Sequence, residues 1–91
     1  MVDPDAAWSA YARELCVELS RRRHAAGLSQ ERLAHAAVIT RFHYQQLEKG
    51  ESKPGTPANP NLRTIFALAQ VLGVPLETLL PPDVPDVTAG R

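Results

Sequence analysis

Apolar residues recur at helical spacing in several stretches of the chain, and the first of these is the longest. One face of it carries Trp8, Ala12, Leu15 and Leu19, at intervals of 4, 3 and 4 residues. These intervals match the period of an amphipathic helix. The pattern predicts a first helix over about residues 6–26. Gly27 is its expected end, because glycine adopts the left-handed conformation that closes a helix without a steric penalty.

Two short helices joined by a tight turn are predicted at about residues 29–48, the second of them over 40–48. Ser29 and Thr40 are the expected N-caps, because a hydroxyl oxygen can accept a hydrogen bond from an unpaired N–H at a helix start. The two caps lie eleven residues apart, which leaves room for one helix and a turn. The inward positions of these helices are Leu33, Ala34, Tyr44 and Leu47.

The connection over residues 50–60 contains three prolines and two glycines. Because proline lacks an N–H and both residue types interrupt regular structure, we expect an extended loop here. A further helix is predicted over 62–72, and Pro75 suits the first turn of a last short helix. The pair Pro81-Pro82 should end that helix, and the tail over 81–91 should be extended or disordered.

The predicted fold is therefore all-α, a compact five-helix bundle over residues 1–80 without a strand. The early part of the first helix, at Trp8, Tyr11 and Ala12, could cover the core or meet a second subunit, and packing on its own chain is the favoured expectation. Cys16 is expected to behave as a small buried apolar residue. The predicted core consists of Leu15, Leu19, Leu28, Leu33, Ala34, Ile39, Tyr44, Leu47, Leu62, Ile65, Phe66, Leu68, Ala69, Leu72, Leu76 and Leu79.

The composition indicates a cytoplasmic protein. No apolar run approaches the roughly 20 residues of a membrane span, and the acidic start lacks the basic and apolar regions of a signal peptide. Cys16 is the only cysteine, so an intramolecular disulfide is impossible.

The formal net charge is zero, but the charges are unevenly distributed. Between Leu19 and Lys53 there are seven basic and three acidic residues, a local charge of +4, which leaves −4 for the rest of the chain. Such asymmetry is typical of a protein with one basic working face, although ordinary mixed surface charge could also produce it.

No catalytic or metal chemistry is indicated. His24, His35 and His43 are spaced 11 and 8 residues apart, so they do not share a metal-binding helix face. The chain has no glycine-rich phosphate loop and no Ser/His/Asp set. We therefore expect no enzyme activity, no metal and no cofactor.

The sequence resembles the phage-repressor type of helix-turn-helix proteins, the Cro and lambda-type repressor (XRE) family. The residues that carry the resemblance are G-L-S-Q-E-R-L-A at 27–34, I-T-R at 39–41, Q-L-E-K-G-E at 46–51, N-L-R-T-I at 61–65 and A-L-A-Q-V-L-G-V-P-L-E-T-L-L at 67–80. The resemblance implies operator DNA as the partner, usually a homodimer, and the helix at 40–48 in the major groove.

The resemblance also implies roles for individual residues. The base-reading residues would be Arg41, Phe42, His43, Gln45 and Gln46, since arginine and glutamine can form paired hydrogen bonds with base edges. DNA-backbone contacts would come from Ser29, Gln30, Thr40, Lys49, Lys53, Asn61 and Arg63. Arg23 and Glu48 match a structural ion pair between the first and third helices.

Two departures from the family pattern affect the reading helix. Val38 stands where the family commonly has glycine, so either the turn carries backbone strain or its geometry shifts. Arg41 is the one firmly cationic residue of the reading helix, so affinity would depend on backbone contacts. In addition, the 50–60 loop is longer than the usual connection.

These observations predict a sequence-specific DNA-binding regulator of transcription that has no membrane partner and acts as a homodimer. Two other functions remain open at this point. One is an antitoxin that represses its own operon and binds a toxin as its protein partner. The other is a protein-interaction module that keeps the fold without binding DNA.

Overall fold

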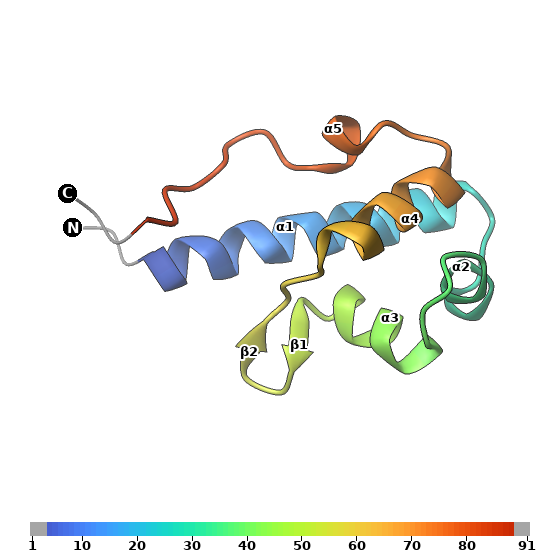
Figure 1. Cartoon of the computed structure of the whole chain (residues 1–91), viewed down its shortest axis with the longest axis horizontal. Helices are drawn as coiled ribbons and strands as arrows, with labels where there is room; N and C mark the ends of the chain where they lie inside the picture. The colour runs from blue at the N-terminus through green and yellow to red at the C-terminus, as the bar shows by residue number, and fades with distance from the viewer. Residues whose placement is uncertain (1–3, 89–91) are drawn as a thin grey trace.

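Five helices and one short hairpin make up the computed structural model, which describes residues 4–88 (Figure 1). The all-α prediction is confirmed apart from the hairpin. The helix nearest the N-terminus begins two residues earlier and ends one residue earlier than predicted. The elements are α1 (Pro4–Ala25), α2 (Gln30–Ala36), α3 (Arg41–Glu48), β1 (Glu51–Lys53), β2 (Thr56–Pro57), α4 (Leu62–Leu72) and α5 (Leu76–Leu79).

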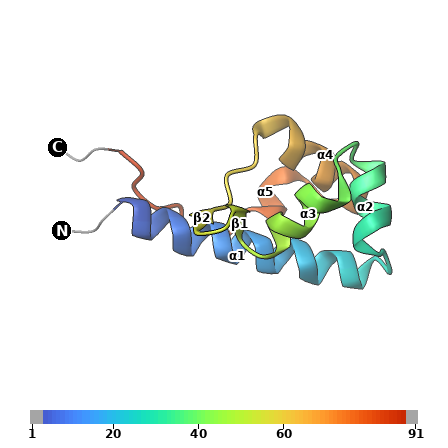
Figure 2. The ribbon, with the colours of Figure 1, turned by 90° about the horizontal axis from the view of Figure 1, so that it is seen from below.

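The long helix α1 runs along the molecule, and the other elements pack around its C-terminal two thirds (Figures 1 and 2). The helix-turn-helix pair lies at one end, with the hairpin next to α3. After α5 the chain runs back along α1, so Pro4 and Thr88 lie at the same end of the molecule. Within residues 4–88, no helix has the length and apolar character needed to cross a membrane.

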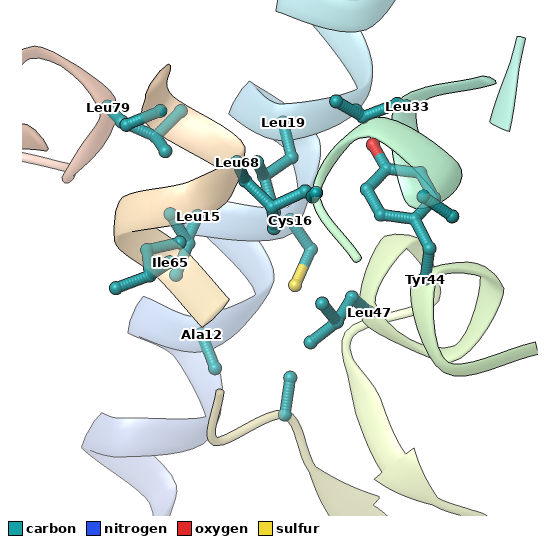
Figure 3. Close-up of a cluster of buried hydrophobic side chains, with 14 residues drawn as sticks. Ala12, Leu15, Cys16, Leu19, Leu33, Tyr44, Leu47, Ile65, Leu68 and Leu79 are labelled. Carbon is teal, nitrogen blue, oxygen red and sulfur yellow. The ribbon is translucent and has the colours of Figure 1, made fainter. Parts of the chain in front are cut away.

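The core lies where α1, α3 and α4 meet (Figure 3). Leu47 of α3 points toward Cys16 of α1, and Tyr44 fills the space next to α2. Both helices of the helix-turn-helix are thereby held by side chains that face away from their outer surface. The fully or nearly buried apolar residues are Tyr11, Ala12, Leu15, Cys16, Leu19, Leu33, Ala34, Ala37, Tyr44, Leu47, Ala58, Ile65, Leu68, Ala69 and Leu79.

Most of the predicted core is confirmed, but the predicted burial of Leu62 and Phe66 is wrong. Their exposed fractions are 65% and 43%. Apolar residues cover more than one side of α4, and packing uses only the side that carries Ile65, Leu68 and Ala69. Four further predicted core residues are only partly buried: Leu28, Ile39, Leu72 and Leu76.

The expectation of an irregular loop at 50–60 is also wrong, because the segment contains an antiparallel hairpin. Lys53 pairs with Thr56 across the turn Pro54-Gly55. Gly55 has a φ of 80°, and proline followed by a glycine with positive φ is a favoured pair for the centre of a tight turn. These residues therefore form a chain reversal that allows the flanking residues to pair.

The base of the hairpin is fixed to the rest of the protein. The Ala58 N–H donates to the Gly50 carbonyl at 2.8 Å, and the Trp8 indole N–H donates to the Ala58 carbonyl at 3.1 Å. Tyr11 donates its hydroxyl to the Pro81 carbonyl at 2.9 Å. The early part of α1 therefore packs on its own chain, as expected from the sequence.

The turn between α2 and α3 is a Schellman motif centred on Val38. The Ile39 N–H donates to the Ala34 carbonyl at 3.0 Å, and the Val38 N–H donates to the His35 carbonyl at 3.1 Å. Val38 has a φ of 60° and is 86% exposed. Of the two alternatives, the turn keeps the left-handed geometry and carries the strain of a β-branched residue.

Replacing Val38 with glycine should therefore stabilise the protein. Relief of a left-handed valine is worth about 1–2 kcal/mol, and the added freedom of glycine in the unfolded chain offsets about 0.5–1 kcal/mol of this. We expect a net gain of up to about 1.5 kcal/mol in the free energy of unfolding, measured by urea denaturation. The matched control is Val17→Gly, in the exposed face of α1, which should destabilise the protein. Equal losses at both positions would contradict the prediction.

Candidate nucleic-acid interface

The three predicted caps hold the starts of α2, α3 and α4. Ser29 Oγ accepts from the Arg32 N–H at 3.1 Å, and Thr40 Oγ1 accepts from the His43 N–H at 3.0 Å. Asn61 Oδ1 accepts from the Thr64 N–H at 2.8 Å. These oxygens are already engaged as caps, so a phosphate would meet the remaining N–H groups of the first turn.

The first turn of α3 is an exposed edge of mixed chemistry. Arg41, Phe42 and His43 are all exposed, and Phe42 keeps 69% of its surface accessible to solvent. Tyr44 and Leu47, on the other side of the same helix, are buried. The start of α3 is therefore an accessible edge that carries a cation, an aromatic ring and an imidazole.

Gln45 and Gln46 do not share this exposure. Gln45 is half-buried, and Gln46 is only 7% exposed, contrary to the expected position on an open reading edge. Both residues lie in the C-terminal half of α3, and β1 packs next to this helix.

The contact expected between Arg23 and Glu48 is present and nearly buried. Arg23 Nε donates to Glu48 Oε2 at 2.6 Å and Arg23 Nη2 donates to Glu48 Oε1 at 3.2 Å. Both side chains are 10% exposed. Arg23 also donates to the Leu28 carbonyl at 2.8 Å. This paired, two-point contact ties the end of α1 to the end of α3 and fixes the direction of the exposed helix.

Gln30 turns toward this ion pair as well. Its Nε2 donates to Glu48 Oε1 at 3.0 Å, and its Oε1 accepts from Gln45 Nε2 at 3.5 Å. The sequence suggested Gln30 only as a DNA-backbone contact. The link to Gln45 was not foreseen, because it joins residues on two helices across the turn.

Glu48 has a depressed pKa despite its burial. Burial raises the pKa, but the hydrogen bond from Arg23, the adjacent Tyr44 hydroxyl, the Gln30 amide and the positive charge of Arg23 outweigh it and hold the pKa below the ordinary value of 4.5. Burial raises the pKa of the neighbouring Tyr44 hydroxyl. Near neutral pH, Glu48 is therefore a carboxylate and Tyr44 is a neutral phenol.

Acid should destabilise the protein through Glu48. A carboxyl group with a lower pKa in the folded state adds stability above its unfolded pKa, and that stability is lost as the pH falls through the folded pKa. The free energy of unfolding of the wild type should therefore drop as the pH falls below 4.5. In Glu48→Gln the drop should be smaller, which chemical denaturation at several pH values would measure. Parallel pH curves for the two proteins would contradict this.

Exposed cations follow α3 in the chain and lie at the start of α4. Lys49 follows the helix, Lys53 lies in β1 and Arg63 lies in the first turn of α4, and all three are exposed. The sequence did not single out Glu31, whose Oε2 lies 4.0 Å from Arg41 Nη1 with both side chains more than half exposed. Such an open pair is weak, so Arg41 can leave it for another acceptor.

The remaining reactive groups lie elsewhere. Cys16 is buried, and burial raises the pKa of its thiol to about 11, which leaves it protonated and unreactive. Between Pro4 and Thr88, no cluster of three or more histidine, cysteine, aspartate or glutamate side chains could hold a metal ion.

Comparison with known proteins assigns the family. No curated protein is significantly similar to this chain in sequence. The profile of the helix-turn-helix family HTH_3 matches residues 19–79, which is more than half of the chain and includes α2, α3, α4 and the hairpin. The match excludes most of α1 and the segment after α5. The chain therefore belongs to the helix-turn-helix family of Cro and lambda-type repressors, a family of DNA-binding regulators and not of enzymes.

Proposed function

We propose that this protein is a sequence-specific transcriptional regulator that inserts the first turn of α3 into the major groove of operator DNA. One observation carries the proposal. Arg41, Phe42 and His43 are exposed together at the start of α3, and the Arg23–Glu48 pair attaches this helix to α1. A helix fits the major groove, and its N-terminal side chains reach the base edges.

The exposed side chains differ in what they can read. Arg41 can donate two hydrogen bonds to O6 and N7 of guanine, and Phe42 can contact a thymine methyl group. His43 can reach a base or a phosphate. Gln46 is a weaker candidate than its sequence position suggests, since only 7% of its surface is exposed. Lys49, Lys53 and Arg63 are the proposed phosphate contacts, supported by their exposure.

We propose that the protein acts in the cytoplasm as a homodimer on a palindromic operator. A single protomer offers one cation on the reading edge, and the affinity of such an edge rests largely on phosphate contacts. Two protomers on two half-sites would double those contacts. Sequences selected from a random DNA pool should therefore be palindromic, with half-sites about one helical turn apart. A mass that stays monomeric at high concentration, with and without the selected DNA, would exclude the dimer.

Replacing Arg41 with alanine should weaken binding to the selected DNA about 10- to 100-fold and relax specificity at one base pair. Fluorescence anisotropy with a labelled duplex at fixed salt would measure this. The matched control is Arg21→Ala. It removes the same charge from a similarly exposed arginine that pairs with Glu18, on α1. It should leave specificity unchanged.

Equal effects of the two arginine substitutions would show that binding follows net charge alone. If the wild type has no affinity for any duplex at low salt, a protein-interaction module becomes the better assignment. Binding of the same protein partner by both variants would then support the protein-interaction module. The antitoxin assignment would require that the same protein binds DNA and also binds a toxin.

A further inference from the structure

Four side chains form a continuous series of hydrogen bonds from the buried end of α1 to the outer side of α3. Arg23 donates to Glu48, Gln30 donates to Glu48 and Gln45 donates to Gln30. The ion pair at one end of the series is nearly buried, with both side chains 10% exposed, and Gln30 and Gln45 are half-buried. Gln45 is also one helical turn from Arg41, so both lie on one stripe of α3.

The chemistry of Glu48 decides which way the Gln30 amide faces. A carboxylate can only accept hydrogen bonds, and Glu48 is ionised because its pKa is held below its ordinary value. Gln30 must therefore present its NH2 group to Glu48, at 3.0 Å, and its carbonyl oxygen faces the opposite way.

The orientation of Gln30 then decides the orientation of Gln45. The Gln30 oxygen lies 3.5 Å from the Gln45 amide and can only accept, so the NH2 group of Gln45 must face it. One N–H of that group is engaged. The carbonyl oxygen and the second N–H of Gln45 remain for a partner outside the protein.

A carbonyl oxygen beside an N–H matches one base better than the others. Adenine offers a donor at N6 and an acceptor at N7 in the major groove, whereas guanine offers two acceptors there. We propose that Gln30 is a positioning residue that orients Gln45 to read adenine at the base pair next to the one read by Arg41. This inference rests on the proposed function, since it assigns specificity to the same helix.

The experiment is selection from a random DNA pool with the wild type, Gln45→Ala and Gln30→Lys. Lysine at position 30 still donates to Glu48 and adds a cation near phosphate, but it cannot accept from Gln45. The wild type should prefer adenine at one position by about tenfold. Both variants should lose that preference while the position read by Arg41 keeps its own. Overall affinity should fall in Gln45→Ala and hold or rise in Gln30→Lys.

The outcomes separate the positioning role from its alternatives. If Gln30→Lys keeps the adenine preference, Gln30 contacts only the DNA backbone and the inference is overturned. It is also overturned if Gln45→Ala selects the same sequences as the wild type. If the wild type enriches no sequence, the proposed function itself fails. Thermal unfolding of both variants checks the fold, because a purely structural role for Gln30 would lower stability without changing one base preference.

Discussion

Replacing Glu48 with alanine should lower the free energy of unfolding by about 3–5 kcal/mol, the usual cost of leaving one partner of a buried ion pair alone. Arg23 would keep its charge at a site where only 10% of the side chain meets solvent. The amide of Gln30 would lose its acceptor as well. For a domain whose total stability is about 5–15 kcal/mol, this loss can leave much of the protein unfolded at 37 °C.

The chain contains an exposed counterpart that serves as the control. Arg21 pairs with Glu18 at 2.6 Å, the same distance as Arg23 to Glu48, but the Arg21 side chain is 64% exposed. Water replaces the lost contact in Arg21→Ala, so stability should change far less. Urea denaturation of both variants and the wild type measures the difference. Equal losses would mean that burial does not set the strength of the Arg23–Glu48 pair.

A double variant tests whether the pair stabilises the fold or only becomes costly when broken. Apolar residues of similar volume can replace a buried ion pair with little loss. Arg23→Met with Glu48→Leu should therefore be much more stable than Glu48→Ala. Its DNA specificity should still suffer, since Gln30 would have no carboxylate to orient it. Stability and specificity would then prove separable at this site.

Replacing Leu47 with alanine should cost about 2–5 kcal/mol, which combines lost burial with the cavity left behind. Leu47 is 2% exposed and points toward Cys16 in the core. The cavity cannot close easily, because α3 is also fixed by the Arg23–Glu48 contact. Thermal and urea denaturation would measure the loss.

The matched control is Leu62→Ala, in α4. Leu62 is 65% exposed, so the same change in side chain should cost less than about 1 kcal/mol. A similar loss at both positions would place Leu62 in a buried environment and contradict the packing of α4. Binding of Leu47→Ala to selected DNA at 10 °C, where the folded population is largest, would show whether α3 keeps its exposed edge.

The features predicted correctly from the sequence are those that local chemistry determines. The caps at Ser29, Thr40 and Asn61, and the left-handed geometry at Val38, depend on the residues immediately around them. The Arg23–Glu48 contact was obtained only from the family resemblance, because 25 residues separate its partners and no periodicity links them.

The incorrect predictions share a physical cause, which is that tertiary packing decides which faces of each segment are buried. The apolar residues of α4 cover more than one side, and only assembly with α1 and α5 selects Ile65, Leu68 and Ala69. Gln46 belongs to the outer part of α3 by spacing, yet it is only 7% exposed in the folded chain. Pro54 and Gly55 predict an irregular loop, because the strands that flank them are too short to show an alternation of apolar and polar residues.

The sequence by itself therefore determined the helices, their caps, the strained turn and the membership of a helix-turn-helix family. These features depend on local backbone preferences and on motifs that are read in order. Tertiary structure alone decided which side chains reach solvent and how their polar groups are oriented. It left Arg41, Phe42 and His43 open, covered most of Gln46, and linked Gln45 through Gln30 to Glu48, because exposure and hydrogen-bond direction exist only once distant segments have packed together.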